Sequence, residues 1–81
     1  MRPWVEMQIT VKLVGGFVHT VGFSERQLEV EPGTTIADVL ASIAIDRTRP
    51  MIVARNGHGA GGDEEVRAGD RILVSPIFSG G

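Results

Sequence analysis

The chain has 81 residues, 42% hydrophobic and 22% charged, and its formal net charge is −2. This length predicts one domain, residues 1–81, with a single modest core. The acidic balance argues against nucleic-acid binding, no apolar run approaches the roughly 18 residues of a membrane span, and the absence of cysteine excludes disulfides, thiolate nucleophiles and zinc-thiolate sites.

The first part of the chain predicts two strands joined by a loop. Apolar and polar residues alternate over Met7–Leu13, which predicts a strand with one face on a core. Residues 27–31 alternate in the same way and predict a second, half-buried strand. Between them, residues 17–26 are expected to form a loop that tucks some apolar side chains inward. Residues 1–5, which include a proline and lack a signal-peptide pattern, are expected to form an N-terminal extension of a cytoplasmic protein.

The middle of the chain predicts one helix. Thr35 occupies an N-cap position and Asp38 follows three residues later, where it complements the free amides of the first turn. The helix is expected to end near Ile45. Its apolar stripe follows helical spacing and comprises Ile36, Val39, Leu40 and Ile43.

The next segment predicts a strand, a turn and a loop. Met51–Ala54 is a continuous apolar run, expected to be a strand covered on both sides or shielded by the helix. Asn56-Gly57 has strong turn chemistry. Residues 57–62, rich in glycine, predict a mobile loop.

The last part predicts a strand behind a turn. Val66 is expected in a short bridging strand, and residues 68–70 form a turn. Residues 72–78 are expected to form the last strand, whose pairing Pro76 limits because it lacks an amide donor. The order predicts an α+β protein with a mixed sheet of four to five strands and one main helix packed across it.

Several side chains that suggest a site are better explained as structure. Residues 57–62 lack the Lys-Ser/Thr that a phosphate loop needs. His19 and His58 have no second pair of ligands at metal spacing, and the acidic run 63–65 is typical of a solvated face. No serine stands in a nucleophile elbow. We therefore expect no bound metal or cofactor and no enzyme active site.

The final residues, SPIFSGG, are the most informative segment. Ile77 is most simply a core residue, whereas Phe78 is equally compatible with the core and with a surface that a partner grips. Residues 79–81 are expected to form a flexible tail, because Gly80 and Gly81 have no Cβ.

Three segments together resemble the ubiquitin-like β-grasp family of sulfur carriers, which includes the small subunit of molybdopterin synthase and the thiamine-pathway sulfur carrier. They are LEVEPGTTIADVLASI, MIVARNG and AGDRILVSPIFSGG. The resemblance implies that the first and last strands are adjacent and parallel and that the sheet grips the helix.

The resemblance also implies a function for the Gly81 carboxylate, which is ionised at neutral pH and must be activated. A ubiquitin-activating-type adenylyltransferase would use ATP and Mg²⁺ to form an acyl adenylate, which a persulfide converts to a thiocarboxylate. Gly80 would give the tail its flexibility, and Ile77, Phe78 and Ser79 would contact the partner. The carrier itself would bind no cofactor.

The acceptor stays open at this point, because residues 15–26 and 57–62 depart from the patterns of these carriers. The chain length and the SPIF segment favour sulfur delivery to a synthase large subunit in molybdenum or tungsten cofactor synthesis. The alternatives are a thiazole synthase of thiamine synthesis, tRNA thiolation, and a ubiquitin-like protein modifier or interaction module.

Overall fold

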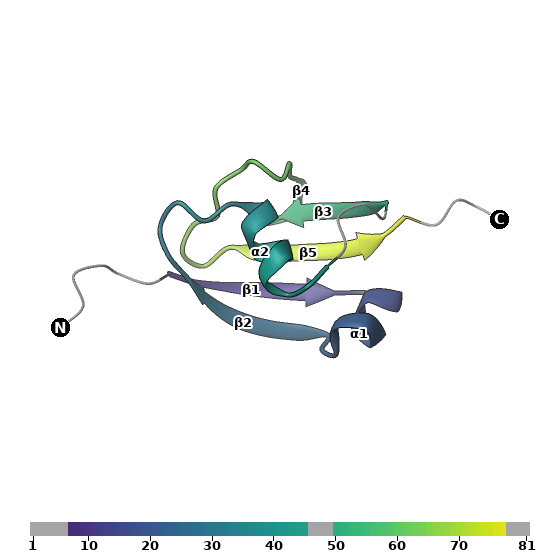
Figure 1. Cartoon of the computed structure of the whole chain (residues 1–81). Helices are drawn as coiled ribbons and strands as arrows, with labels where there is room; N and C mark the ends of the chain where they lie inside the picture. Colours follow the sequence, from purple (N-terminus) through teal and green to yellow (C-terminus); the bar gives the residue numbers. More distant parts are fainter. Residues whose placement is uncertain (1–6, 46–49, 78–81) are drawn as a thin grey trace.

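The computed structural model describes residues 7–45 and 50–77 (Figure 1). The expected extension, residues 1–5, lies outside this part. The elements are, in chain order, β1 (Met7–Leu13), α1 (Gly16–Val21), β2 (Glu25–Val30), α2 (Ile36–Ser42), β3 (Met51–Arg55), β4 (His58–Gly59) and β5 (Arg71–Pro76). The predicted α+β architecture with a mixed sheet is confirmed. None of the helices in the described segments has the length and hydrophobicity needed to cross a bilayer.

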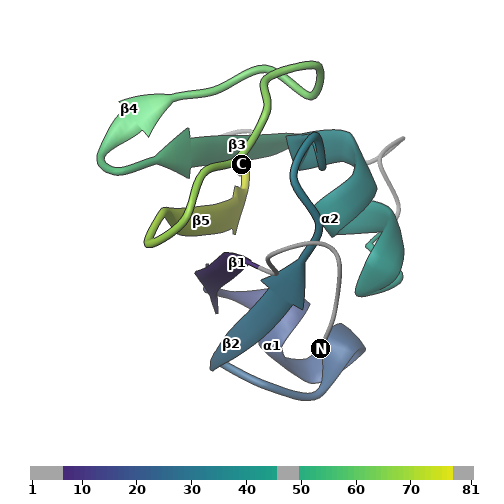
Figure 2. The same cartoon turned by 90° about the vertical axis from the view of Figure 1, so that its left-hand side faces the viewer.

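The five strands form one sheet in the order β2-β1-β5-β3-β4. β1 and β5, the first and last strands, are parallel neighbours at its centre, as the resemblance implied. The other pairs are antiparallel. Figures 1 and 2 show that α2 crosses one face of the sheet, which leaves the opposite face without a helix.

The core lies between α2 and the sheet. The apolar residues that alternate along β1 and β5, and the apolar stripe of α2, all face this core. Each buried aliphatic side chain contributes roughly 1.5–3 kcal/mol to stability. Its most buried members are Ile9, Val11, Leu13, Ile36, Val39, Ile72 and Val74.

The predicted cap of α2 is confirmed. Thr35 Oγ1 accepts a hydrogen bond from the Asp38 amide at 3.2 Å, and Asp38 Oδ2 accepts one from the Thr35 amide at 3.1 Å. The helix ends at Ser42, before the expected Ile45. Ala44 adopts a left-handed conformation, φ 62°, which turns the chain and returns Ile45 to the core.

The loop expected over residues 17–26 is wrong. Gly16–Val21 forms α1, which Gly22 closes in the left-handed conformation, and β2 already begins at Glu25. α1 has six residues, too few to show a helical period, and buries Phe17 against the core.

For the segment Met51–Ala54, the exposure of Ile52, 54%, rules out a strand covered on both sides and leaves the alternative of a strand covered on one side, where Met51 and Val53 pack against the core. Two other predictions for the second half need correction. Residues 57–62 do not form a loop throughout, because His58–Gly59 pairs with β3 as β4 and the Ala60 amide donates to the Val53 carbonyl. The bridging residue is Glu65, which pairs with Thr35, rather than Val66, whose side chain is buried.

Candidate functional site

β5 ends in the C-terminal segment that the sequence predicts to carry the functional site. Pro76 is the last residue of β5 and pairs with Met51, and the next amide, that of Ile77, donates to the Pro50 carbonyl at 3.3 Å. Ile77 is 49% exposed, so the expectation of a core residue is wrong. The partner contact that the family resemblance implies for Ile77 stays a prediction. Phe78, Ser79, Gly80 and Gly81 lie outside the described residues.

The helix α1 lies at the same end of the sheet as the end of β5 (Figure 1). α1 packs on β5, and the Val14 amide, just before the helix, donates to the Val74 carbonyl at 3.1 Å. The sequence predicts a loop, not a helix, at this position. The helix lies beside the end of β5 (Figure 1).

The other end of β5 is anchored by a buried carboxylate. Asp70 is only 6% exposed, and its oxygens accept from Asn56 Nδ2 at 2.9 Å and from the Arg67 amide at 2.8 Å. Arg55 Nη1 lies 3.5 Å from Asp70 Oδ2. Burial by itself raises the pKa of Asp70, but the hydrogen bonds from Asn56 and Arg67 and the charge of Arg55 together outweigh burial, and the pKa lies below its ordinary value.

Asn56 joins two turns that are distant in the sequence. Besides the side-chain bond to Asp70, the backbone amide of Asn56 donates to the Arg71 carbonyl, and Asn56 Oδ1 accepts from the Arg71 backbone amide, both at 2.9 Å. Asn56 and Gly57 have φ values of 53° and 84°, which confirms the expected turn. The Asn-Gly and Gly-Asp-Arg segments that carried the family resemblance are therefore two halves of one hydrogen-bonded network.

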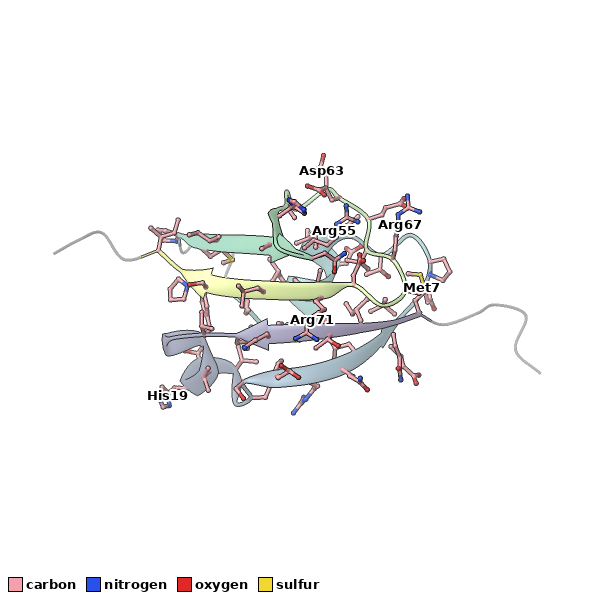
Figure 3. The ribbon with its side chains drawn as sticks, turned by 180° about the vertical axis from the view of Figure 1, so that it is seen from behind. Met7, His19, Arg55, Asp63, Arg67 and Arg71 are labelled. Carbon is pink, nitrogen blue, oxygen red and sulfur yellow. The ribbon has the colours of Figure 1, made fainter. Side chains whose placement is uncertain are left out.

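The sheet face opposite α2 carries a hollow of about 260 Å³. The sequence alone does not predict this hollow, because the register of three strands and a turn brings its lining residues together. In Figure 3 the Arg71 side chain lies on this face at the boundary of β5 and β1. The lining residues are Thr10, Lys12, Ala54, Asn56, Gly57, Arg71, Ile72 and Leu73.

The amides at the start of α2 are hydrogen-bonded to the loop after β4. The amides of Ile36 and Ala37, at the start of α2, donate to the carbonyls of Glu64 and Gly62, both at 2.9 Å. These amides are therefore occupied. His19 and His58 are exposed, and no cluster of three or more acidic or histidine side chains fit for a metal occurs in residues 7–45 and 50–77.

In the acidic run, residues 63–65, Glu64 makes a hydrogen bond and an ion pair. Glu64 Oε2 accepts from the Gly61 amide at 2.7 Å, and Glu64 Oε1 lies 3.4 Å from Arg55 Nη2. In Figure 3, Arg55 and Arg67 lie near the loop that carries Asp63. The run therefore supports the loop after β4, while Asp63 and Glu65 stay exposed, as expected.

Comparison with known proteins gives a family and a fold. The model of the ThiS family matches residues 11–81. The crystal structure of small archaeal modifier protein 1 of H. volcanii superposes with a TM-score of 0.78 at 21% identity, over 89% of this chain and 99% of that one.

Two further structures are similar. A Pyrococcus furiosus protein described as molybdopterin converting factor subunit 1 gives a TM-score of 0.77 at 23% identity, over 89% of this chain and 99% of that one. Urm1 of Trypanosoma brucei gives 0.66 at 19% identity over the whole of both chains. The shared fold is the ubiquitin-like β-grasp, here with α1 in addition to the main helix.

Proposed function

This chain belongs to the ThiS family of small ubiquitin-like proteins, and from that membership we propose that it is a sulfur carrier whose reacting group is the carboxylate of Gly81. The observation that carries the proposal is that the family match runs through Gly80 to Gly81. The carrier acts as a co-substrate of other enzymes in the cytoplasm rather than as an enzyme itself.

The proposed chemistry activates and then sulfurates the carboxylate. An oxygen of Gly81 attacks the α-phosphate of Mg²⁺-bound ATP in an adenylyltransferase of the ubiquitin-activating type, and pyrophosphate leaves. A persulfide then attacks the acyl carbon and displaces AMP. A second thiolate breaks the sulfur–sulfur bond of the resulting acyl disulfide, which leaves a thiocarboxylate on Gly81. This thiocarboxylate donates its sulfur to the large subunit of a synthase in molybdopterin synthesis.

The folded residues support this role by fixing the point at which the chain leaves the sheet. The Asp70 network fixes the start of β5, and the Ile77–Pro50 hydrogen bond follows its last paired residue. Pro76 offers no amide to the ladder. Four residues follow Ile77, which span about 13 Å when extended. Gly81 can therefore reach the active site of a partner while the sheet stays folded.

A protein modifier is the second candidate, and the similarity to small archaeal modifier protein 1 favours it. The modifier would use the same adenylate but pass the acyl group to a lysine amine. Thiamine thiazole synthesis and tRNA thiolation are alternative destinations for the sulfur.

Intact mass spectrometry of protein made in its native host tests the proposal. We expect a species in which one oxygen is replaced by sulfur, localised to Gly81 by fragmentation. Isopeptide adducts without that species would favour the modifier. Full function of a chain that lacks Gly80 and Gly81 would contradict both.

A further inference from the structure

Asn56 is the single asparagine of the chain, and a glycine follows it. An asparagine in this context is prone to lose its side-chain amide, because the backbone nitrogen of the next residue can attack the side-chain carbonyl carbon. Glycine has no Cβ to obstruct that nitrogen. The chain therefore has one position at which its sequence favours this reaction, and the same residue joins the two turns around Asp70.

The folded structure holds the reacting amide in place. Asn56 Nδ2 donates to Asp70 Oδ1 and Asn56 Oδ1 accepts from the Arg71 amide, both at 2.9 Å. The Nδ2 nitrogen is the group that departs, so the reaction must break the bond to Asp70. The carboxamide must also turn its carbon towards the Gly57 nitrogen, which draws Oδ1 away from Arg71. The network should therefore slow the loss of the amide.

The surroundings of the turn allow the network to open without complete unfolding. Asn56 and Gly57 are both exposed, so water reaches them. The turn connects β3 to β4, which has two residues and lies at the edge of the sheet. A short edge hairpin opens at a lower free energy than the central strands of a sheet. Such openings would expose Asn56 to the attack of the Gly57 nitrogen.

An aspartate at position 56 would not fit the network that the asparagine makes. The new oxygen would take the place of Nδ2, which lies 2.9 Å from Asp70 Oδ1. Asp70 is only 6% exposed, and two carboxylates this close in a buried site repel each other and have no donor between them. The cation beside Asp70, Arg55, also lies 3.4 Å from Glu64. The modified chain would therefore be less stable.

We propose that Asn56 is a spontaneous modification site that distinguishes molecules that have opened from those that have stayed folded. The Gly57 nitrogen bonds to Asn56 Cγ and gives up its proton, and the side-chain nitrogen leaves as ammonia. Water then hydrolyses the succinimide: breaking the new bond gives aspartate, and breaking the original backbone bond gives isoaspartate. The folded network suppresses the reaction, and its products prevent the network from forming again.

The modification would act on the strand that leads to the C-terminal segment. Asn56 holds the Arg71 amide at the start of β5, and Gly80 and Gly81 follow the end of that strand in the sequence. A modified molecule would keep both glycines but would lose the anchor of β5. The inference does not depend on sulfur transfer, so its failure would leave the proposed function as it stands.

The first test measures the rate of the reaction. The chain is kept in mildly alkaline buffer, folded or unfolded in urea, and peptide mapping follows the conversion of residue 56 to aspartate and isoaspartate. We expect conversion to be at least about tenfold faster in urea, because the folded network must open before the attack. Equal rates in the two conditions would overturn the protection by the network.

Matched glycine variants identify the attacking nitrogen. In urea, Gly57→Ala should slow the conversion, because its Cβ obstructs the nitrogen that attacks Asn56. Gly59→Ala carries the same change away from the asparagine and should react as the unchanged chain does. Because both variants are unfolded in urea, their different folded stabilities do not enter. Equal rates for the two variants would contradict attack by Gly57.

The second test measures the effect of the product. We expect Asn56→Asp to lower the unfolding midpoint by about 5–15 °C at neutral pH. In the double variant Asn56→Asp/Asp70→Asn the carboxylate and the carboxamide change places, so their hydrogen bond is kept with its direction reversed. This exchange should restore at least about half of the loss. An unchanged midpoint for Asn56→Asp, or a double variant as unstable as the sum of its two changes, would overturn the inference.

Discussion

Asp70 is the residue whose chemistry most directly links sequence to architecture. Its carboxylate is buried and accepts from the Asn56 side chain and the Arg67 amide, so replacing it with asparagine, which has a single side-chain oxygen, leaves a donor unsatisfied. We expect Asp70→Asn to lower the free energy of unfolding by about 1–3 kcal/mol at neutral pH. Urea denaturation measures this, with Asp63→Asn, an exposed acid, as the control.

The lowered pKa of Asp70 also predicts a pH dependence. A carboxyl with a lower pKa in the folded state contributes stability above its ordinary pKa of about 3.9, and this contribution is lost as the pH falls through the folded value. The unchanged chain should therefore lose more stability than Asp70→Asn below about pH 4. Equal losses between pH 5 and pH 3 would contradict a paired Asp70.

Gly81 gives a prediction that follows from the proposed function. We expect Gly81→Ala to keep the unfolding midpoint and to slow thiocarboxylate formation by about tenfold to a hundredfold, because a misplaced reacting carbonyl costs rate on this scale. Unfolding curves and a sulfur-transfer assay on the same sample measure both. A large fall in the midpoint would instead indicate that the tail is structural.

The Asn56-Gly57 turn, which joins β3 to β4, allows a clean test of backbone conformation at the level of elements. Gly57 has φ 84° and Gly59 does not lie in the positive region, yet a Cβ added at either meets nothing within 4 Å. We expect Gly57→Ala to destabilise the protein by about 1 kcal/mol and Gly59→Ala to be neutral or slightly stabilising. Thermal melts compare the two, and equal effects would contradict a conformational cause.

The cap of α2 is the second feature at this scale. Thr35→Ala removes the acceptor for the Asp38 amide and should cost about 1 kcal/mol. Ser42→Ala, at the other end of α2, removes only a hydroxyl that donates to the Val39 carbonyl and should change stability by less than about 0.5 kcal/mol. The denaturant midpoints of the two variants show how much each end of α2 contributes to stability.

These elements also show where sequence reasoning succeeds and fails. The capping residues Thr35 and Asp38 and the Asn56-Gly57 turn were predicted, because their chemistry is local. The sequence does not predict α1, because six residues cannot display a period and the packing of Phe17, Val18 and Val21 against the core is a tertiary contact. The sequence wrongly predicts Ile77 to be a core residue, because the apolar pattern does not reveal that β5 ends at Pro76.

For the whole molecule, the α+β class follows from the order of periodic segments, and the parallel pairing of β1 with β5 follows only from the family resemblance. The hollow could not be predicted from either. Its charged and apolar residues come from positions 10–12, 54–57 and 71–73, and only the register of the strands brings them together.

The central position of β5 has a consequence for the order in which the strands pair during folding. The strand made last in this chain lies between β1 and β3, so the sheet cannot close until β5 enters it, and such non-local pairing is the slow part of folding. Lys12 and Arg71 become neighbours only at that step. A chain in which β5 has not entered the sheet, or has left it, would therefore lack both the β1–β5 pairing at the centre of the sheet and the hollow that Lys12 and Arg71 line.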